Sequence, residues 1–388
     1  MKRFFSFSLV LTVLFSFHTT AAFANEKSSA ELADRAKSAI LIERDTGAVL
    51  YEKNSDQKLP PASMTKIMTM ILIMEALDEG KIKLNEKVRT SEYAASMGGS
   101  QIFLEPGEEM TVDEMLKGIA IGSGNDASVA MAEHLAGSEE EFVEMMNKKV
   151  KELGLKDTQF KNPTGLPVKD HYSTAHDMAM MAKELMKYDK ITNYTGKYED
   201  YLRQNTEKKF WLVNTNRLVK FYPGVDGVKT GFTNEAKYCL TATAKKGNMR
   251  VIAVVFGADT PKDRNVQVTK MLDYAFSQYQ TTPLYKKDTK IATLKVNKGN
   301  KKDVKVVTSE PVSLLTKKGT STKDIKKDIT LKQPLEAPVQ KGDEVGMLTI
   351  KKDGKVLSKS PLVAGESVQE ASWWDLFKRT FSRFTQTS

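Results

Sequence analysis

The sequence predicts a mixed α/β (α+β) protein: an antiparallel sheet packed against helices, with a helical subdomain, followed by a small all-β domain. Strand signals at 39–53 and 238–256 flank a middle region with helical periodicity. After residue 283 apolar residues alternate with lysine, as at 291–296, which is typical of strands. The chain has 388 residues, of which 40% are hydrophobic, so it is long and apolar enough for two folded domains.

The elements of the first domain are predicted from local signals. Residues 39–53 form a hairpin around Asp45-Thr46-Gly47, and residues 63–77 form a helix so apolar on every side that it must be buried. Thr111 with Glu114, and Ser138 before a run of glutamates, mark helix starts. We also expect helices at 126–135, 174–188 and 263–278, a long loop at 150–175, and strands at 238–244 and 249–256.

The N-terminal segment has the pattern of a secretory signal peptide. Lys2 and Arg3 precede an apolar run at 4–17, and Ala22-Phe23-Ala24 supplies a small-residue cleavage site. The run is short for a membrane span. We therefore expect residues 1–24 to be cleaved and the mature chain to be exported, either to the outer face of the cytoplasmic membrane or into the medium.

The net charge of +10 belongs to one region of the chain. Residues 284–360 hold 19 lysines, no arginine and 9 acidic residues, so this region carries the whole excess. Because arginine and interleaved aromatic residues are missing and the protein is expected outside the cytoplasm, the pattern argues against nucleic acid as a partner. An anionic lipid surface or wall polymer fits the charge, and so does a solvated lysine-rich β surface.

The C-terminal segment, 366–388, has the pattern of an amphipathic helix that lies on a membrane surface. It combines aromatic anchors with a basic flank, and it is too short and too charged to span a bilayer. A helix docked on the β domain is the alternative. The apolar side of the helical wheel comprises Trp373, Trp374, Leu376, Phe377, Phe381 and Phe384, and the polar side comprises Asp375, Lys378, Arg379, Ser382 and Arg383.

Three short motifs point to the chemistry. They are Ser63-Met64-Thr65-Lys66 (S-x-x-K), Ser123-Gly124-Asn125 (S-x-N) and Lys229-Thr230-Gly231 (K-T-G), separated by 60 and 106 residues. Each motif is common alone. All three in this order, each in a suitable local structure, form a strong signal for an active-site serine.

The spacing within these motifs has a physical reason. Ser63 and Lys66 are three positions apart at a helix start, so their side chains share one face. A serine hydroxyl attacks poorly until a base takes its proton. Lys66 is the expected base, because burial, the helix N-terminus and a second cation, Lys229, all lower the pKa of a lysine. Ser123 precedes a helix and can face the cleft, and Gly231, in a motif that starts a strand, lets a substrate backbone lie alongside.

The sequence lacks the residue patterns that other catalytic mechanisms require. The mature chain has only His134, His171 and His176, and no G-x-S-x-G elbow, so a Ser-His-Asp hydrolase is not expected. No H-E-x-x-H motif or cysteine cluster indicates zinc. We expect His171 and His176 to cap or pack a loop, and Cys239 to lie inert in a buried strand. No metal or organic cofactor is implied.

On these motifs the chain resembles the penicillin-binding, active-site-serine family, and within it the low-molecular-mass D-alanyl-D-alanine carboxypeptidases (peptidase S11 family). The flanking residues at 59–66 and 227–233 also look like those enzymes. The resemblance covers the whole chain and implies a β-lactamase/transpeptidase-like domain. It implies a signal peptide at 1–24, a penicillin-binding serine peptidase domain at 25–282, a small all-β domain at 283–365 and an amphipathic membrane-anchor helix at 366–388.

The resemblance also implies an activity. It is a hydrolase that removes the terminal D-alanine from peptidoglycan stem pentapeptides through an acyl-enzyme on Ser63, regulates cell-wall cross-linking, and is blocked by β-lactams. Lys66 would be the base and Ser123 would relay a proton to the leaving D-alanine. The other implied substrate-binding residues are Asn125, Lys229, Thr230, Gly231, Phe232 and Arg264. Asn125 would also position Lys66, and Lys229 would set the electrostatic field of the site. Thr230 and Arg264 would face the terminal carboxylate, and the backbone N–H of Phe232 would form an oxyanion hole with that of Ser63.

Rival functions exist for this set of motifs. A D,D-endopeptidase has the same motifs and stays open. A class A β-lactamase adds a glutamate that activates the deacylating water, but the only acidic residues at 154–183 are Asp157, Asp170 and Asp177, so fast β-lactam hydrolysis is not expected. A penicillin sensor would need a transmembrane connection, which we do not find, and an inactive wall-binding scaffold would have lost a motif residue.

Overall fold

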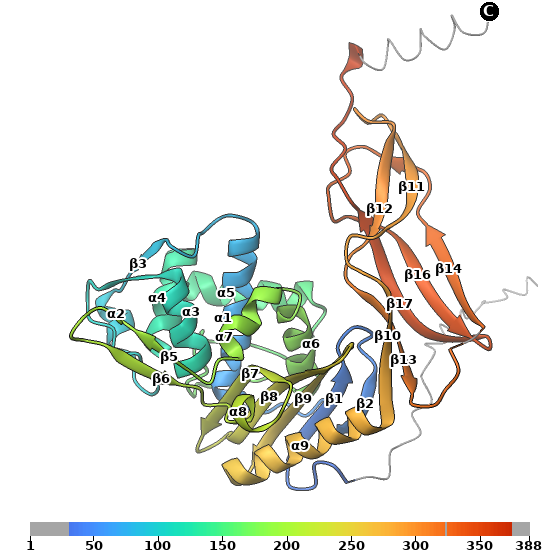
Figure 1. Ribbon diagram of the computed structural model, residues 1–388. Coiled ribbons are helices and arrows are strands. Elements are labelled where there is room, and N and C mark those ends of the chain that lie inside the picture. The colour runs from blue at the N-terminus through green and yellow to red at the C-terminus, as the bar shows by residue number, and fades with distance from the viewer. Residues whose placement is uncertain (1–30, 323, 375–388) are drawn as a thin grey trace, which may run out of the picture. The chain divides into compact units, whose positions relative to one another are not determined.

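The computed structural model describes residues 31–322 and 324–374 of the chain (Figure 1). The predicted signal peptide at 1–24 and residues 375–388 of the predicted C-terminal helix lie outside the described residues. Within the described ranges, none of the helices combines the length and the apolar composition that crossing a bilayer requires.

The first domain is built on a five-stranded sheet with the order β2-β1-β9-β8-β7. Every neighbouring pair is antiparallel, so the N-terminal hairpin lies beside strands from the far end of the domain. This confirms the antiparallel sheet expected from strand signals at both ends of a helical middle. The strands are β1 (Ser38–Glu43), β2 (Val49–Lys53), β7 (Val225–Thr233), β8 (Lys237–Lys246) and β9 (Met249–Ala258).

Both faces of this sheet are buried. On β9, Ile252, Val254 and Phe256 belong to the core that also contains side chains of α1 (Lys66–Asp78) and α6 (Ala175–Leu185). The alternate β9 side chains are buried as well, because α9 (Pro261–Gln278) packs on β8 and β9 from the other side (Figure 1). Alternation of side chains along a strand thus gives two apolar layers.

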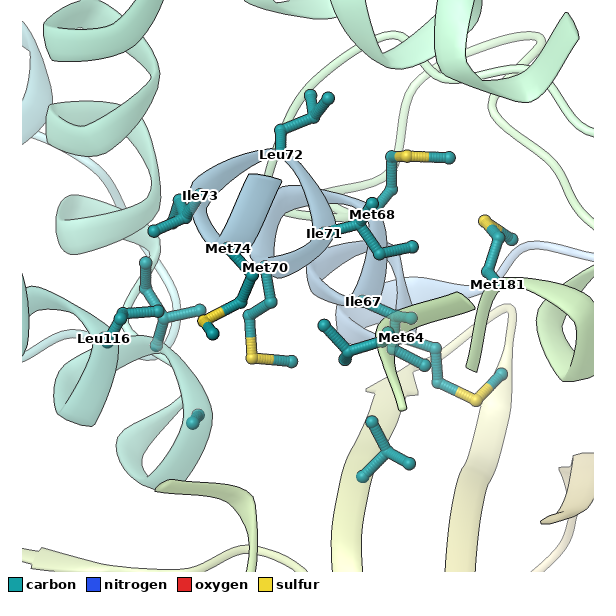
Figure 2. Packing of buried hydrophobic residues seen from close by; sticks show 14 of the residues in the cluster. Met64, Ile67, Met68, Met70, Ile71, Leu72, Ile73, Met74, Leu116 and Met181 are labelled. Atoms are coloured by element: carbon teal, nitrogen blue, oxygen red, sulfur yellow. The ribbon is translucent and has the colours of Figure 1, made fainter. Parts of the chain in front are cut away.

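Helix α1 runs through the middle of the core. Figure 2 shows its apolar side chains, among them Met68, Leu72 and Met74, spreading to every side of the helix. This confirms the buried helix predicted at 63–77, with one difference at its start. Ala62–Thr65 forms a 3-10 turn, η1, and the α-helix begins at Lys66. Ala62 has a φ of 48°, which an α-helix does not accept, so Ser63 sits in a turn ahead of the helix.

The helical subdomain contains the predicted helix starts. Thr111 and Glu114 form a capping box, and the side chain of Ser138 accepts a hydrogen bond from the N–H of Glu141. The predictions did not include the hairpin of β5 (Glu199–Leu202) and β6 (Phe210–Val213). The other elements are β3 (Lys87–Arg89), α2 (Glu92–Ala95), β4 (Glu109–Thr111), α3 (Val112–Lys117), the π-helical turn η2 (Gly118–Gly122), α4 (Asn125–Ala136), α5 (Glu139–Glu152), η3 (Asp189–Ile191), α7 (Thr192–Thr195) and α8 (Leu218–Phe221).

The C-terminal part is all-β, as predicted. A six-stranded sheet has the order β14-β16-β17-β12-β11-β15, and β10 pairs with β13. Its core includes Leu294, Val304, Leu348 and Leu362. The predicted boundary at 282/283 falls inside β10, and the domain limits stay predictions. The strands are β10 (Tyr279–Tyr285), β11 (Lys290–Asn297), β12 (Asp303–Thr308), β13 (Val312–Lys317), β14 (Ile325–Leu331), β15 (Leu335–Glu336), β16 (Glu344–Lys352) and β17 (Lys355–Ala364).

Candidate active site

The turn that carries Ser63 lies directly against strand β7. A Cβ built on Gly231 would stand 2.7 Å from the carbonyl oxygen of Pro61 and 3.3 Å from the backbone nitrogen of Met64. The approach of the Ser63 turn therefore requires a glycine at this position. The predicted access of a substrate backbone to Gly231 stays a prediction. The K-T-G motif also lies in the second half of β7 (Val225–Thr233) rather than at its start.

Lys66 is completely buried and is held by two short hydrogen bonds. Its Nζ donates to Asn125 Oδ1 at 2.6 Å and to the carbonyl oxygen of Thr164 at 2.7 Å. A neutral amine has two hydrogens and one lone pair, so these bonds leave the lone pair for the Ser63 hydroxyl. The Oγ of Ser63 lies 3.3 Å from Nζ. The arrangement brings S-x-x-K and S-x-N together and suits Lys66 as the acceptor of the Ser63 proton.

The electrostatics of the site favour the neutral form of this amine. Burial, and after it the charge of Lys229, hold the pKa of Lys66 well below its usual range. Lys229 is itself buried, and its Nζ donates to the carbonyl of Thr230 at 3.2 Å. Burial, with the nearby charge of Arg264, lowers the pKa of Lys229 to about 7. The charge of Arg264 thus acts on Lys229, and the charge of Lys229 acts on Lys66, among buried groups.

Ser123 and Asn125 lie in an irregular turn between η2 and α4 of the helical subdomain. The π-helical η2 ends at Ser123, whose φ of 63° is left-handed. This turn brings Asn125 to the first position of α4 (Asn125–Ala136), where its side chain reaches Lys66. The Nδ2 of Asn125 donates to the carbonyl of Gly98 at 2.7 Å. Asn125 therefore joins Lys66 to the loop that begins at Gly98. Ser123 is nearly buried, and its predicted proton relay stays a prediction.

Arg264 supplies a buried positive charge that lacks a carboxylate. Its Nε and Nη2 donate to Asn265 Oδ1 at 3.1 and 2.9 Å. Throughout the described part of the chain, no Asp or Glu forms an ion pair with it. Burial lowers its pKa to about 10. The Oγ1 of Thr230 donates to Thr215 Oγ1 at 2.7 Å. A buried guanidinium without an anion suits a substrate carboxylate.

Phe232 lies at the exposed end of the site. Its ring is 49% exposed and stacks on Tyr238 with ring centroids 4.4 Å apart. The side chain is therefore partly open to solvent, and the predicted part of the Phe232 backbone N–H in an oxyanion hole stays a prediction. Burial raises the pKa of the Cys239 thiol to about 12, so the thiol stays protonated and is a poor nucleophile.

The sequence-based reasoning missed the part played by the loop between α5 and α6. The carbonyl of Thr164 binds Lys66, and the Oγ1 of Thr69 donates to the carbonyl of Pro163 at 2.7 Å. A backbone carbonyl leaves no side-chain signal in a sequence, although the turn residues at 162–165 marked the loop. The same loop, with 58–62, Thr233 and Glu235, lines a cavity of about 620 Å³ beside the Ser63 turn.

Comparisons with known proteins identify the family of the chain. The chain matches the Peptidase S11 family, D-alanyl-D-alanine carboxypeptidase, over residues 24–260, and the penicillin-binding protein 5 C-terminal domain over residues 279–370. It is 67% identical over 388 residues to D-alanyl-D-alanine carboxypeptidase DacF of Bacillus subtilis, with 100% of each chain covered. The chain belongs to the Peptidase S11 family.

Solved structures agree with this assignment to the D-alanyl-D-alanine carboxypeptidases. Penicillin-binding protein 5 from Haemophilus influenzae has a TM-score of 0.68 at 33% identity, covering 87% of this chain and 98% of that chain. Penicillin-binding protein D2 from Listeria monocytogenes, in the ampicillin-bound form, has a TM-score of 0.56 at 30% identity, covering 62% of this chain and 98% of that chain. The predicted family, fold class and hydrolase activity are confirmed.

Proposed function

We propose that this carboxypeptidase removes the terminal D-alanine of peptidoglycan stem pentapeptides through an acyl-enzyme on Ser63. The main support for this proposal is the way in which the Lys66 amine is held and oriented toward Ser63. Both hydrogens of its neutral amine are held by Asn125 and Thr164, and its Nζ lies 3.3 Å from the Ser63 hydroxyl. A buried amine fixed in this way is ready to take a proton.

In the acylation step, Ser63 Oγ attacks the carbonyl carbon of the penultimate D-alanine and its proton passes to Lys66. Backbone N–H groups of Ser63 and Phe232 bind the resulting oxyanion. The tetrahedral intermediate collapses, the C–N bond breaks, and the leaving D-alanine takes a proton by way of Ser123. Lys66, having given its proton to the leaving D-alanine, then takes a proton from the water that attacks the ester. The C–O bond to Ser63 breaks, the shortened peptide leaves, and Lys66 passes that proton to Ser63 Oγ.

The terminal carboxylate of the substrate selects the cleaved bond. Arg264 and Thr230 bind it, while Lys229 supplies the field that favours an anion in the cleft. This assignment is supported by the buried guanidinium that no Asp or Glu of the described residues neutralises. The residues of the stem peptide ahead of the scissile bond occupy the cavity beside the Ser63 turn.

β-Lactams acylate the same serine because the lactam amide stands in for the D-Ala-D-Ala bond. The ampicillin-bound form of the Listeria monocytogenes protein supports this for a relative of similar fold. Residues 154–183 contain no glutamate that could activate water. Release of the penicilloyl group is accordingly slow, and the enzyme is inhibited rather than acting as a β-lactamase.

The enzyme works outside the cytoplasm and on a membrane surface. The basic start, apolar run and small-residue site at 1–24 support export. Residues 366–372 of the predicted anchor are not helical, and Val368 pairs with Val339 in the core of the β domain. The amphipathic pattern that begins at Trp373 supports an interfacial anchor, and Trp373 and Trp374 are 68% and 63% exposed. The lysines of the β domain favour the same anionic surface.

The test is release of D-alanine from an acyl-D-Ala-D-Ala peptide by the full chain and by Ser63→Ala. Release should fall by at least about 10³-fold in the variant, because the reaction loses its covalent step. Ser96→Ala, which removes an exposed hydroxyl of the same domain, should release D-alanine as the wild type does. A cross-linked stem-peptide dimer is assayed in parallel. Cleavage of the dimer without release of D-alanine would assign the site to a D,D-endopeptidase instead.

A further inference from the structure

The loop at 159–173 is fastened to the core at its neck. Gln159 and Tyr172 pair in an antiparallel bridge, and Ser173 pairs with Leu59, just ahead of the catalytic turn. Between these ends lies Thr164, whose carbonyl oxygen accepts the 2.7 Å hydrogen bond from Lys66. The position of this carbonyl decides where one of the two amine hydrogens of Lys66 points, and so where its lone pair points.

A buried histidine joins the two limbs of the loop neck to the catalytic turn. The Nδ1 of His171 accepts a hydrogen bond from the backbone N–H of Lys161 at 3.1 Å. A neutral imidazole has one N–H, so Nε2 carries the hydrogen and donates to Thr65 Oγ1 at 2.8 Å. Burial lowers the pKa of His171 to about 4, which keeps the ring in this neutral form at neutral pH.

Thr65 connects the hydrogen bond of His171 to the turn that carries Ser63 and Lys66. Its side chain is fully buried, and it lies between Ser63 and Lys66 in the 3-10 turn. A Cβ on Gly165 would stand 2.9 Å from its Oγ1, so the loop and Thr65 are already in close packing. A change in the His171–Thr65 bond therefore moves the loop relative to Lys66, whereas neither residue has a reactive atom at Ser63.

We propose that His171 is a positioning residue, which through Thr65 holds the loop at 159–173 against the catalytic turn so that the Thr164 carbonyl keeps Lys66 aimed at Ser63. The inference rests on the proposed function, in which Lys66 is the base for Ser63. Substitutions of His171 and Thr65 should therefore affect acylation through the same hydrogen bond, so their effects are not independent.

Two variants of the histidine separate its two hydrogen bonds. The Oδ1 of asparagine occupies roughly the place of Nδ1, so His171→Asn keeps the bond from Lys161 and loses the one to Thr65. The Nε2 of glutamine reaches the place of the imidazole Nε2, so His171→Gln keeps the donor to Thr65. Thr65→Val removes the acceptor with little change of shape, and Thr65→Ser keeps it.

The experiment measures acylation of the full chain by a labelled penicillin, and kcat and KM for an acyl-D-Ala-D-Ala peptide. His171→Asn and Thr65→Val should each slow acylation about 10- to 100-fold, as misplacement of a catalytic group does. KM should stay nearly constant while kcat falls. His171→Gln and Thr65→Ser should retain most of the rate. The double variant Thr65→Val/His171→Asn should be no slower than the slower single variant.

Three results would overturn the inference: wild-type acylation rates in both His171→Asn and Thr65→Val, effects of the two that multiply in the double variant, or rates for His171→Gln as low as for His171→Asn. Thermal unfolding shows that each protein is folded at the assay temperature, and if Thr65→Val is not, the comparison of the asparagine and glutamine variants decides. Absence of labelling in the wild type would instead contradict the proposed function itself.

Discussion

Gly165 lies so close to Ala62 that a Cβ at position 165 would be 1.8 Å from the carbonyl oxygen of Ala62. Gly165 also has a φ of 85°, in the left-handed region. No side chain fits between the loop and the turn that presents Ser63. The close approach is what lets the neighbouring Thr164 carbonyl reach Lys66.

Gly165→Ala should therefore disturb both stability and acylation. We expect a loss of about 3 kcal/mol or more in the free energy of unfolding, because a backbone atom blocks the new methyl group. Acylation by labelled penicillin should slow about 100-fold. Gly137→Ala is the matched control: its φ is 88° but nothing lies within 4 Å, so it should cost only about 1 kcal/mol and leave acylation unchanged. Equal effects of the two substitutions would show that strain, and not the contact with Ala62, limits position 165.

Removing the charge of Lys229 should shift the pH dependence of acylation. Lys229 lowers the pKa of Lys66 by repulsion, so Lys229→Gln raises the pKa of Lys66. Because acylation needs neutral Lys66, the acidic limb of the pH–rate profile should move to higher pH. Lys66→Arg, which cannot deprotonate, should be inactive at every pH. An acidic limb that stays at the wild-type pH in Lys229→Gln would mean that Lys66 is not the titrating base.

Arg264→Met should lower activity without lowering stability. The variant loses a charge-assisted hydrogen bond to the substrate carboxylate, which lowers kcat/KM by about 30-fold, or ~2 kcal/mol. It also loses a buried cation without a carboxylate partner, so its thermal midpoint should be equal or higher. A peptide with an amidated C-terminus should be cleaved equally by both proteins. Arg217→Met, at an exposed position, serves as the control. A variant with undiminished preference for the free carboxylate would remove Arg264 from the binding site.

The stability of the protein should depend on His171 between pH 4 and 6.5. The folded pKa of about 4 lies below the ordinary value of 6.5, so the unfolded chain binds more protons in this window. Stability is therefore fully present above pH 6.5 and is lost as pH falls toward 4. The decrease in thermal midpoint from pH 7 to pH 5 should be smaller for His171→Gln than for the wild type. Parallel decreases would contradict a neutral, buried imidazole.

The neighbouring residues Gly231 and Phe232 should respond in opposite ways. Gly231→Ala places a methyl group 2.7 Å from the Pro61 carbonyl, which pushes the Ser63 turn away from β7 and should reduce acylation about 100-fold. Phe232→Ala removes an exposed ring and keeps the backbone N–H, so acylation should change little. Rate constants for labelled penicillin measure both. A large loss in Phe232→Ala would assign its side chain a role that the oxyanion hole does not need.

The sequence was sufficient for the features that depend on spacing along the chain. Periodicity predicted the buried helix after Ser63, and the capping residues Thr111 and Ser138 are where the helices begin. The three motifs are brought together as expected, because Asn125 and Ser63 both meet Lys66 and Gly231 packs against the turn of Ser63. Family resemblance, rather than spacing, was the basis for Arg264.

Features that depend on packing between distant segments were not predicted. The carbonyl of Thr164 acts through the backbone, so no residue type marks it. The contact of Gly231 with the Ser63 turn was not predicted either, because it arises only when η1 docks on β7. The short strands β5 and β6 lie among polar residues, where two-residue alternation is too brief to identify them.

We propose a mechanism with a covalent intermediate on Ser63 that forms with the help of Lys66. The most direct measurement is mass spectrometry of the full chain after brief exposure to a penicillin, followed by peptide mapping. This mechanism predicts one added penicilloyl group, located on Ser63, and no addition in Ser63→Ala or Lys66→Arg. A penicilloyl group on another residue such as Ser123, or addition that persists in Lys66→Arg at the wild-type rate, would contradict it.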